Sequence, residues 1–292
     1  PAANGALRDY DDFAAAAHSR SALVTAVVDP LSLALLKEPG AWGADIVVGS
    51  TQRFGTPLGL GGPHAAFLAT REKFKRNMPG RIIGVSVDRL GNRALRMALQ
   101  TREQHIKRER ATSNICTAQA LPAIMVAFYT LYHGAEGIRR IALNAHCHAV
   151  AAAETLKKLG FELSGSLFFD TIEIKADAEK VRTLALEQQL NFCYPDQNHV
   201  RISFDELSNL DETNEIIAVF AKAIGKKPVT LKKIDESAAF PKNLCRTTPY
   251  LTDPVFRKYR SETAMMRYIK KLERRDLSLT QSMIPLGSCT MK

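Results

Sequence analysis

Short apolar runs separated by turn residues mark the start of the chain. Three runs have strand length, residues 22–28, 46–48 and 65–69. Asp29-Pro30 ends the first run, and Asp at an N-cap followed by Pro predicts a helix over 31–37. Because a helix then joins two strands through short connections, this region is predicted to form a parallel α/β unit.

In the middle of the chain, apolar residues recur at the spacing of a helix. Residues 137–159 carry apolar side chains at helical intervals, and residues 115–132 are almost all apolar. The second pattern predicts a buried helix that ends at Gly134. Before Gly160 we also expect helices over 6–20, 70–77 and 94–109, a strand over 82–87 and a turn over 88–92.

Beyond Gly160, short strands and helices alternate. We expect strands over 161–164, 171–174 and 200–204, and helices over 178–189, 209–224 and 262–274. Two or three strands with helices on one side indicate a small α+β domain. We therefore predict the C-terminal part of a large α/β domain (1–136), a small α+β domain with its connecting helix (137–227) and an extended segment (228–292).

Composition narrows the class of protein. The chain is 46% hydrophobic, which suffices for a sizeable core, and it has no run of about 18 apolar residues, so we expect no membrane span. Its start lacks a secretory signal and an initiator Met, so we expect part of a longer protein. Five scattered cysteines without a CxxC pair argue against a zinc site or a disulfide framework and suit a reducing compartment.

Positive charge is concentrated in one segment. The net charge is +10, and residues 71–110 hold twelve Lys and Arg against four Asp and Glu, a local excess of +8. Such a segment could contact nucleic acid, a phosphate-bearing ligand or an acidic protein, or form only a solvated face. Arg102 and His105 would share one face of the predicted helix there.

The most informative stretch is the glycine-rich loop between the second and third strands. In pyridoxal-phosphate enzymes of the aspartate-aminotransferase fold, such a loop carries the lysine that forms a Schiff base with the cofactor. Here the position reads Gln52-Arg53, and no lysine occurs between Lys37 and Lys73. Asp29, 23 residues before Gln52, matches the Asp that pairs with the cofactor's pyridine nitrogen in that fold, or it only caps a helix.

The other candidate binding and catalytic residues are supported by weaker sequence signals. The loop Gly59–His64 could bind an anion through backbone N–H groups or could simply reverse the chain. His146 and His148 lie two apart on a predicted helix, so they point to different sides and make poor joint metal ligands. Cys289, beside Ser288 and Thr290, could be an exposed thiol, but no neighbouring base supports a nucleophile.

Three long motifs resemble those of the glycine cleavage P-proteins, which are glycine decarboxylases. They are GADIVVGSTQRFGTPLGLGGPHAAF (43–67), MPGRIIGVSVDRLGNRALRMALQTREQHIKRERATSNIC (78–116) and SMIPLGSCTMK (282–292). The resemblance runs over nearly the whole chain. It implies an aspartate-aminotransferase-like α/β fold (pyridoxal-phosphate fold type I), incomplete at the N-terminus, followed by the small domain.

The resemblance also implies two homologous halves, of which only the second holds the lysine. This chain then covers part of the lysine-less first half, which supports the site, and the start of the second, which the 282–292 motif opens. Pyridoxal 5'-phosphate would be bound covalently outside the chain. Having both halves on one chain implies the fused, homodimeric form, located in the bacterial cytoplasm or, in a eukaryote, in the mitochondrial matrix.

The implied reaction decarboxylates glycine and transfers the aminomethyl group to the lipoyl-bearing H-protein. No catalytic residue is assigned to this chain. Weak candidates near the partner half's cofactor are Ser288, Cys289 and Thr290. The basic segment suggests a surface for the acidic H-protein, formed by Arg71, Lys73, Lys75, Arg76, Arg102 and His105.

Two other functions remain open from the sequence. A self-contained pyridoxal-phosphate aminotransferase or lyase would need a lysine at Gln52-Arg53. A basic module that binds nucleic acid would need a recognition fold and aromatic residues interleaved with the basic segment, and neither is found. We therefore expect no nucleic-acid partner, no membrane contact and no metal.

Overall fold

A computed structural model describes residues 1–78, 82–99, 104–111, 119–237, 240–275, 277–278 and 280–283, with the side chains of residues 104 and 105 excepted. The first sheet has the order β1-β2-β3, in which β1 and β2 run parallel and β2 and β3 antiparallel. Its strands are β1 (Thr25–Val27), β2 (Ile46–Ser50) and β3 (Ala66–Thr70), and helix α1 (Asp11–Ser19) precedes them. All three strands lie where the apolar runs predicted them.

The helix predicted over 31–37 is wrong and is replaced by the 3-10 turn η1 (Ser32–Ala34). Asp29 does not cap it, since Leu31 is the N-cap residue and no side chain bonds there. The Asp29 Oδ1 instead accepts a hydrogen bond of 2.9 Å from the Leu31 N–H and forms a local turn ahead of η1. The chain then leaves the helical path to pair with a distant segment: the Lys37 N–H donates to the Leu244 carbonyl and the Arg246 N–H to the Leu35 carbonyl. Tertiary pairing therefore overrides the local helix signal.

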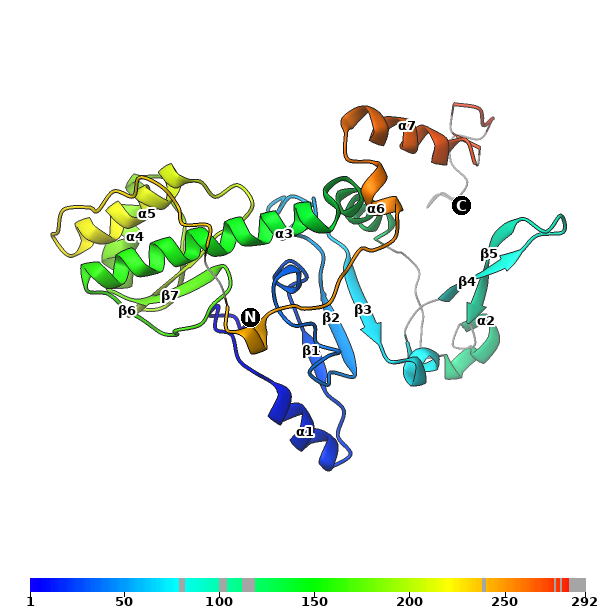
Figure 1. The fold of residues 1–292 in the computed structure, drawn as a ribbon, viewed down its shortest axis with the longest axis horizontal. Helices are drawn as coiled ribbons and strands as arrows, with labels where there is room; N and C mark the ends of the chain where they lie inside the picture. Colours follow the sequence, from blue (N-terminus) through cyan, green and yellow to red (C-terminus); the bar gives the residue numbers. More distant parts are fainter. Residues whose placement is uncertain are drawn as a thin grey trace.

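A hairpin projects away from the first sheet (Figure 1). Strands β4 (Ile82–Val87) and β5 (Arg93–Leu99) are antiparallel, and 3-10 helix η2 (Glu72–Asn77) precedes them. The predicted turn is confirmed, because the Asp88 carboxylate accepts hydrogen bonds of 2.8 Å from the N–H groups of Leu90 and Asn92. The helix predicted over 94–109 is wrong for its first part, since 93–99 is a strand. Its last part is helical, because α2 (Gln104–Lys107) and η3 (Arg108–Arg110) cover the described residues there.

The longest element, α3 (Ala120–Leu159), joins the two parts of the chain. Gly134 interrupts it with non-helical angles, φ 59° and ψ −176°, so the break predicted there is confirmed as a kink between two helices. The first positions of the helix predicted over 115–132 lie outside the described residues. The burial predicted for this helix is wrong for the described positions, since Leu121 and Ile124 are 68% and 50% exposed.

The second sheet has the order β6-β7-β9-β8, with all of its neighbouring strands antiparallel. Its inward residues Ile172, Ile174, Val200 and Ile202 are buried against α4, α5 and the C-terminal part of α3, so the helices cover one face. The elements are β6 (Glu162–Leu163), β7 (Thr171–Lys175), α4 (Ala178–Glu187), β8 (Cys193–Asp196), β9 (His199–Ser203) and α5 (Leu210–Ala223). The sequence pattern missed β8, which is short and contains a proline.

The remaining chain runs back along the molecule through η4 (Lys242–Leu244), α6 (Val255–Lys258) and α7 (Glu262–Glu273). Helix α6 lies beside α3 near its kink (Figure 1). In the part of the chain that the structure describes, no helix is long and apolar enough to cross a bilayer.

Candidate functional site

Arg53 and two carboxylates form the site that the sequence points to. Arg53 follows β2, and its Nη1 lies 2.5 Å from Asp29 Oδ2 and 2.5 Å from Asp170 Oδ2. Asp29 follows β1, whereas Asp170 immediately precedes β7 of the second sheet. One guanidinium thus ties the loop after β2 to both sheets.

The three side chains are largely shielded from water, with exposed fractions of 22% for Arg53, 23% for Asp29 and 9% for Asp170. Burial raises the pKa of Asp29, and the Arg53 charge only partly offsets this effect. Burial alone would lower the pKa of Arg53, but the charges of Asp29 and Asp170 outweigh it and raise that pKa above its ordinary value. The guanidinium also lies 5.9 Å from the centre of the Phe169 ring. Arg53 therefore keeps its positive charge, and its contacts hold the guanidinium in place.

Gln52 turns into its own loop. Its Nε2 donates a hydrogen bond of 2.5 Å to the Thr56 carbonyl, and its N–H lies 3.1 Å from Ser50 Oγ. The hydroxyls of Thr51 and Thr56 are buried and have no hydrogen-bond partner among the described residues. Neither Gln52 nor these two threonines has an amine, so the loop lacks the group that a Schiff base requires.

These residues do not fit pyridoxal phosphate. The carboxylate that would face a pyridine nitrogen, Asp29, already binds Arg53, and an amide stands where the amine is needed. The hollow beside them is lined by further acidic residues, Asp205 and Glu206. An anionic cofactor would meet carboxylates there with one guanidinium already engaged.

The loop Gly59–His64, the candidate anion site, reverses the direction of the chain. The N–H groups of Gly61 and Gly62 both donate to the Leu58 carbonyl at 3.0 Å, so they are not free for an anion. This geometry favours the interpretation that the loop only reverses the chain over the interpretation that it binds an anion.

The proposed basic surface is partly neutralised within the chain. Arg71 Nε lies 3.4 Å and Lys73 Nζ 3.8 Å from Asp45 Oδ1, while His18 Nε2 binds the other oxygen at 2.8 Å. Lys75 forms an ion pair with Glu72. Arg76 is exposed at the end of η2. The structure therefore leaves fewer free charges in 71–76 than the sequence suggested.

The remaining candidates are less defined. Arg102, Ser288, Cys289 and Thr290 lie outside the described residues, and of His105 only the backbone in α2 is described. A role for each of them stays a prediction.

The two histidines of α3 are buried and serve different partners, as their spacing predicted. His146 Nδ1 donates to the Phe169 carbonyl at 2.6 Å, and His148 Nδ1 lies 2.7 Å from Thr213 Oγ1. Burial lowers the pKa of both. Across the described residues no group of three or more metal-binding side chains occurs.

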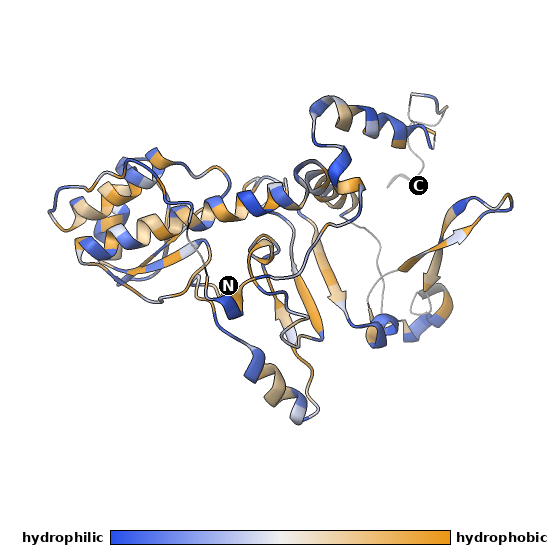
Figure 2. Ribbon diagram, viewed as in Figure 1, coloured by the Kyte–Doolittle hydropathy of each residue, from blue (hydrophilic) through white to orange (hydrophobic). Residues whose placement is uncertain are grey.

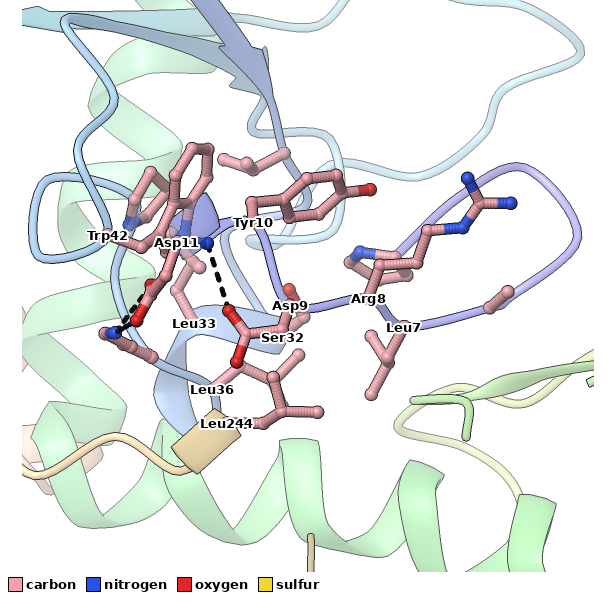
Figure 3. A pocket seen from close by; sticks show the side chains of 15 residues that line it. Leu7, Arg8, Asp9, Tyr10, Asp11, Ser32, Leu33, Leu36, Trp42 and Leu244 are labelled. Atoms are coloured by element: carbon pink, nitrogen blue, oxygen red, sulfur yellow. Dashed lines mark hydrogen bonds and ion pairs between the residues drawn. The ribbon is translucent and has the colours of Figure 1, made fainter. Parts of the chain in front are cut away.

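A separate small cavity lies between the N-terminal segment, η1 and Leu244 (Figure 3). Tyr10 and Trp42 pack over it with ring centres 5.4 Å apart, and Lys37 Nζ lies 2.8 Å from Asp11 Oδ1 near it. Its other walls include the apolar residues Leu7, Val28, Leu33, Leu36 and Leu244. The cavity brings no nucleophile and base together, so we interpret it as a packing seam.

Sequence comparisons identify relatives over the whole chain. Residues 1–220 match the model of the glycine cleavage system P-protein family. Proteins named glycine dehydrogenase (decarboxylating) are 55% identical in Flavobacterium johnsoniae and 53% in Christiangramia forsetii, with 100% of this chain and 31% of each relative covered. The mitochondrial protein of Pisum sativum is 50% identical, with 100% of this chain and 28% of the relative covered. The chain thus spans less than a third of the length of these relatives.

Solved structures give the same picture. A crystal structure of the glycine decarboxylase (P-protein) of the glycine cleavage system, in inhibitor-bound form, matches with a TM-score of 0.71 and 38% identity over 75% of this chain and 52% of that chain. A NifS-like protein from Rickettsia africae matches with a TM-score of 0.52 at 15% identity over 76% of this chain and 59% of that chain, which shows a shared fold alone.

Proposed function

The chain belongs to the glycine cleavage system P-protein family, and from this premise we propose that it forms part of the supporting, lysine-less half of a glycine decarboxylase and does not itself bind the cofactor. Its aspartate-aminotransferase-like α/β fold, expected from the sequence, is confirmed by the structural neighbours. One observation carries the supporting role: Arg53 forms an ion pair with Asp29, and Gln52 lies at the position of the lysine.

The proposed longer protein decarboxylates glycine with pyridoxal phosphate and passes the aminomethyl group to a lipoyl-bearing H-protein. The names of the relatives support the decarboxylase activity. In this proposal the cofactor is held outside residues 1–292. The fused form would be a homodimer, in the bacterial cytoplasm or the mitochondrial matrix. The Pisum sativum relative is named as a mitochondrial protein.

The surface through which this part of the chain would support the catalytic part is the apolar face of the β4–β5 hairpin. Ile83, Val85 and Val87 alternate along β4 and are 54%, 65% and 68% exposed. Met97 lies opposite Ile83, and Leu95 lies opposite Val85, so all five share one face. Figure 2 shows hydrophobic residues along this hairpin.

A two-stranded hairpin with an uncovered apolar face is marginal in water. About two thirds of the length of the relatives lies beyond this chain, since it covers 31% of them. We therefore propose that the hairpin packs on the catalytic part of the longer protein.

The test replaces Val85 and Leu95 together by Asp in the full-length enzyme. We expect at least a tenfold loss of glycine decarboxylation, because a charged hairpin cannot pack on the catalytic part. The control Leu186→Asp changes an exposed leucine on α4, 53% exposed, and should keep full activity. Unchanged activity in the double variant would disprove the supporting role of the hairpin.

A further inference from the structure

Four arginines line one surface hollow. Arg139 comes from α3, Arg246 from the segment after η4, and Arg257 and Arg260 from α6 and its end. We propose that this hollow binds a small oxyanion, the phosphate or carboxylate group of a metabolite-sized molecule. The proposal does not depend on the supporting role of the chain.

Arg246 is held by neutral groups. Its Nε donates to the Thr248 carbonyl at 3.0 Å and its Nη1 to the Leu33 carbonyl at 2.9 Å. The guanidinium lies 4.9 Å from the centre of the Tyr250 ring. Among the described residues, the side chain is therefore positioned by neutral groups. Glu38 is the nearby acid, and it accepts a hydrogen bond of 2.7 Å from the Thr248 hydroxyl.

Arg260 is positioned by the kink of α3. Its Nη1 lies 3.1 Å from Glu136, whose side chain is 82% exposed, and its Nε lies 3.3 Å from the Phe256 carbonyl. The guanidinium packs directly on Gly134, where a side chain would leave no room. Glycine at this position thus allows the fourth cation to reach the hollow.

Arg139 and Arg257 supply the remaining charge. Both are exposed, and neither has a carboxylate at ion-pair distance in the portion of the chain described by the structure. Arg139 and Arg246 both lie close enough to Tyr250 for their charges to act on its phenol. Four arginines and one carboxylate, Glu136, thus line the hollow, and Glu38 lies behind Thr248.

This arrangement suits an oxyanion. A guanidinium offers parallel N–H donors that match two oxygens of a phosphate or a carboxylate. Thr247 and Thr252 also line the hollow and add hydroxyl donors. The hollow is lined by α3, by α6 and the residues after it, and by residues 246–252, so its donors come from three segments of the chain.

The test is calorimetric titration of the full-length holoenzyme with inorganic phosphate and, separately, with citrate. Ionic strength is kept constant with chloride. We expect saturable binding of at least one probe, and Arg139→Gln with Arg257→Gln should weaken it at least tenfold. The probe that binds more tightly identifies a phosphate-bearing or a carboxylate-bearing ligand.

The control is Lys157→Gln with Lys158→Gln, which removes two charges from the last turn of α3 and should leave the affinity unchanged. Equal melting temperatures in chloride will show that both double variants fold. The proposal is overturned if neither probe binds saturably, or if the two double variants bind with the same affinity.

Discussion

Arg53 holds together two carboxylates that would repel each other in a shielded site. Its identity and that of Asp29 follow from the sequence, because both lie at recognisable positions of one strand-loop unit. Asp170 could not be predicted, since it lies 117 residues from Arg53 and nothing near it in the chain signals an ion pair. Local pattern therefore placed Gln52-Arg53 where a lysine would be, whereas only the fold shows that Arg53 pairs with both Asp29 and Asp170.

Arg53→Gln should lower the free energy of unfolding by about 3 kcal/mol, because it leaves Asp29 and Asp170 shielded without a countercharge. Urea unfolding of the full-length protein will measure this loss. Adding Asp170→Asn should restore part of it, since one of the two carboxylates is then neutral.

The matched control for Arg53 is Lys222→Gln, which removes an exposed ion pair with Glu187. That change should cost less than about 1 kcal/mol. Equal effects of the two substitutions would show that the Arg53 cluster contributes no more than a surface pair.

The elements differ in how strongly local sequence decides them. Residues 94–99 are rich in helix formers, yet they form β5 because β4 and the turn at Asp88 pair them into a hairpin. The alternation of Leu95, Met97 and Leu99 was the signal for a strand. By contrast, Asp177 and Asn209 cap α4 and α5 through their side chains, and these helices lie where their sequences predicted them.

Gly134→Ala should destabilise the protein by at least about 2 kcal/mol. The residue has φ 59°, and an added Cβ would lie 2.6 Å from the Phe256 carbonyl oxygen. Thermal and urea unfolding will measure the effect.

Gly225→Ala separates the two causes, since Gly225 has φ 68° but no atom within 4 Å of an added Cβ. It should cost only the backbone strain, about 1 kcal/mol. If the two alanine variants lose equal stability, the packing of α6 on the kink of α3 is not what requires glycine at position 134.

At the scale of the whole molecule, the described chain leaves surfaces that a longer protein would cover. The first sheet has three strands, and residues around its first strand, Leu23 and Val27, are 54% and 77% exposed. The hairpin carries a further apolar face. The chain spans 31% of the first relative, so a longer protein has further residues that could cover these surfaces, and the incomplete large domain stays a prediction. The domain boundaries at 136 and 227 stay predictions.

The central claim is that this chain supports a cofactor site without holding the cofactor. Reduction of the full-length holoenzyme with borohydride fixes pyridoxal phosphate to its lysine, and peptide mapping then locates that lysine. We predict a single modified lysine outside residues 1–292. A pyridoxyl group on any lysine within these residues would contradict the account.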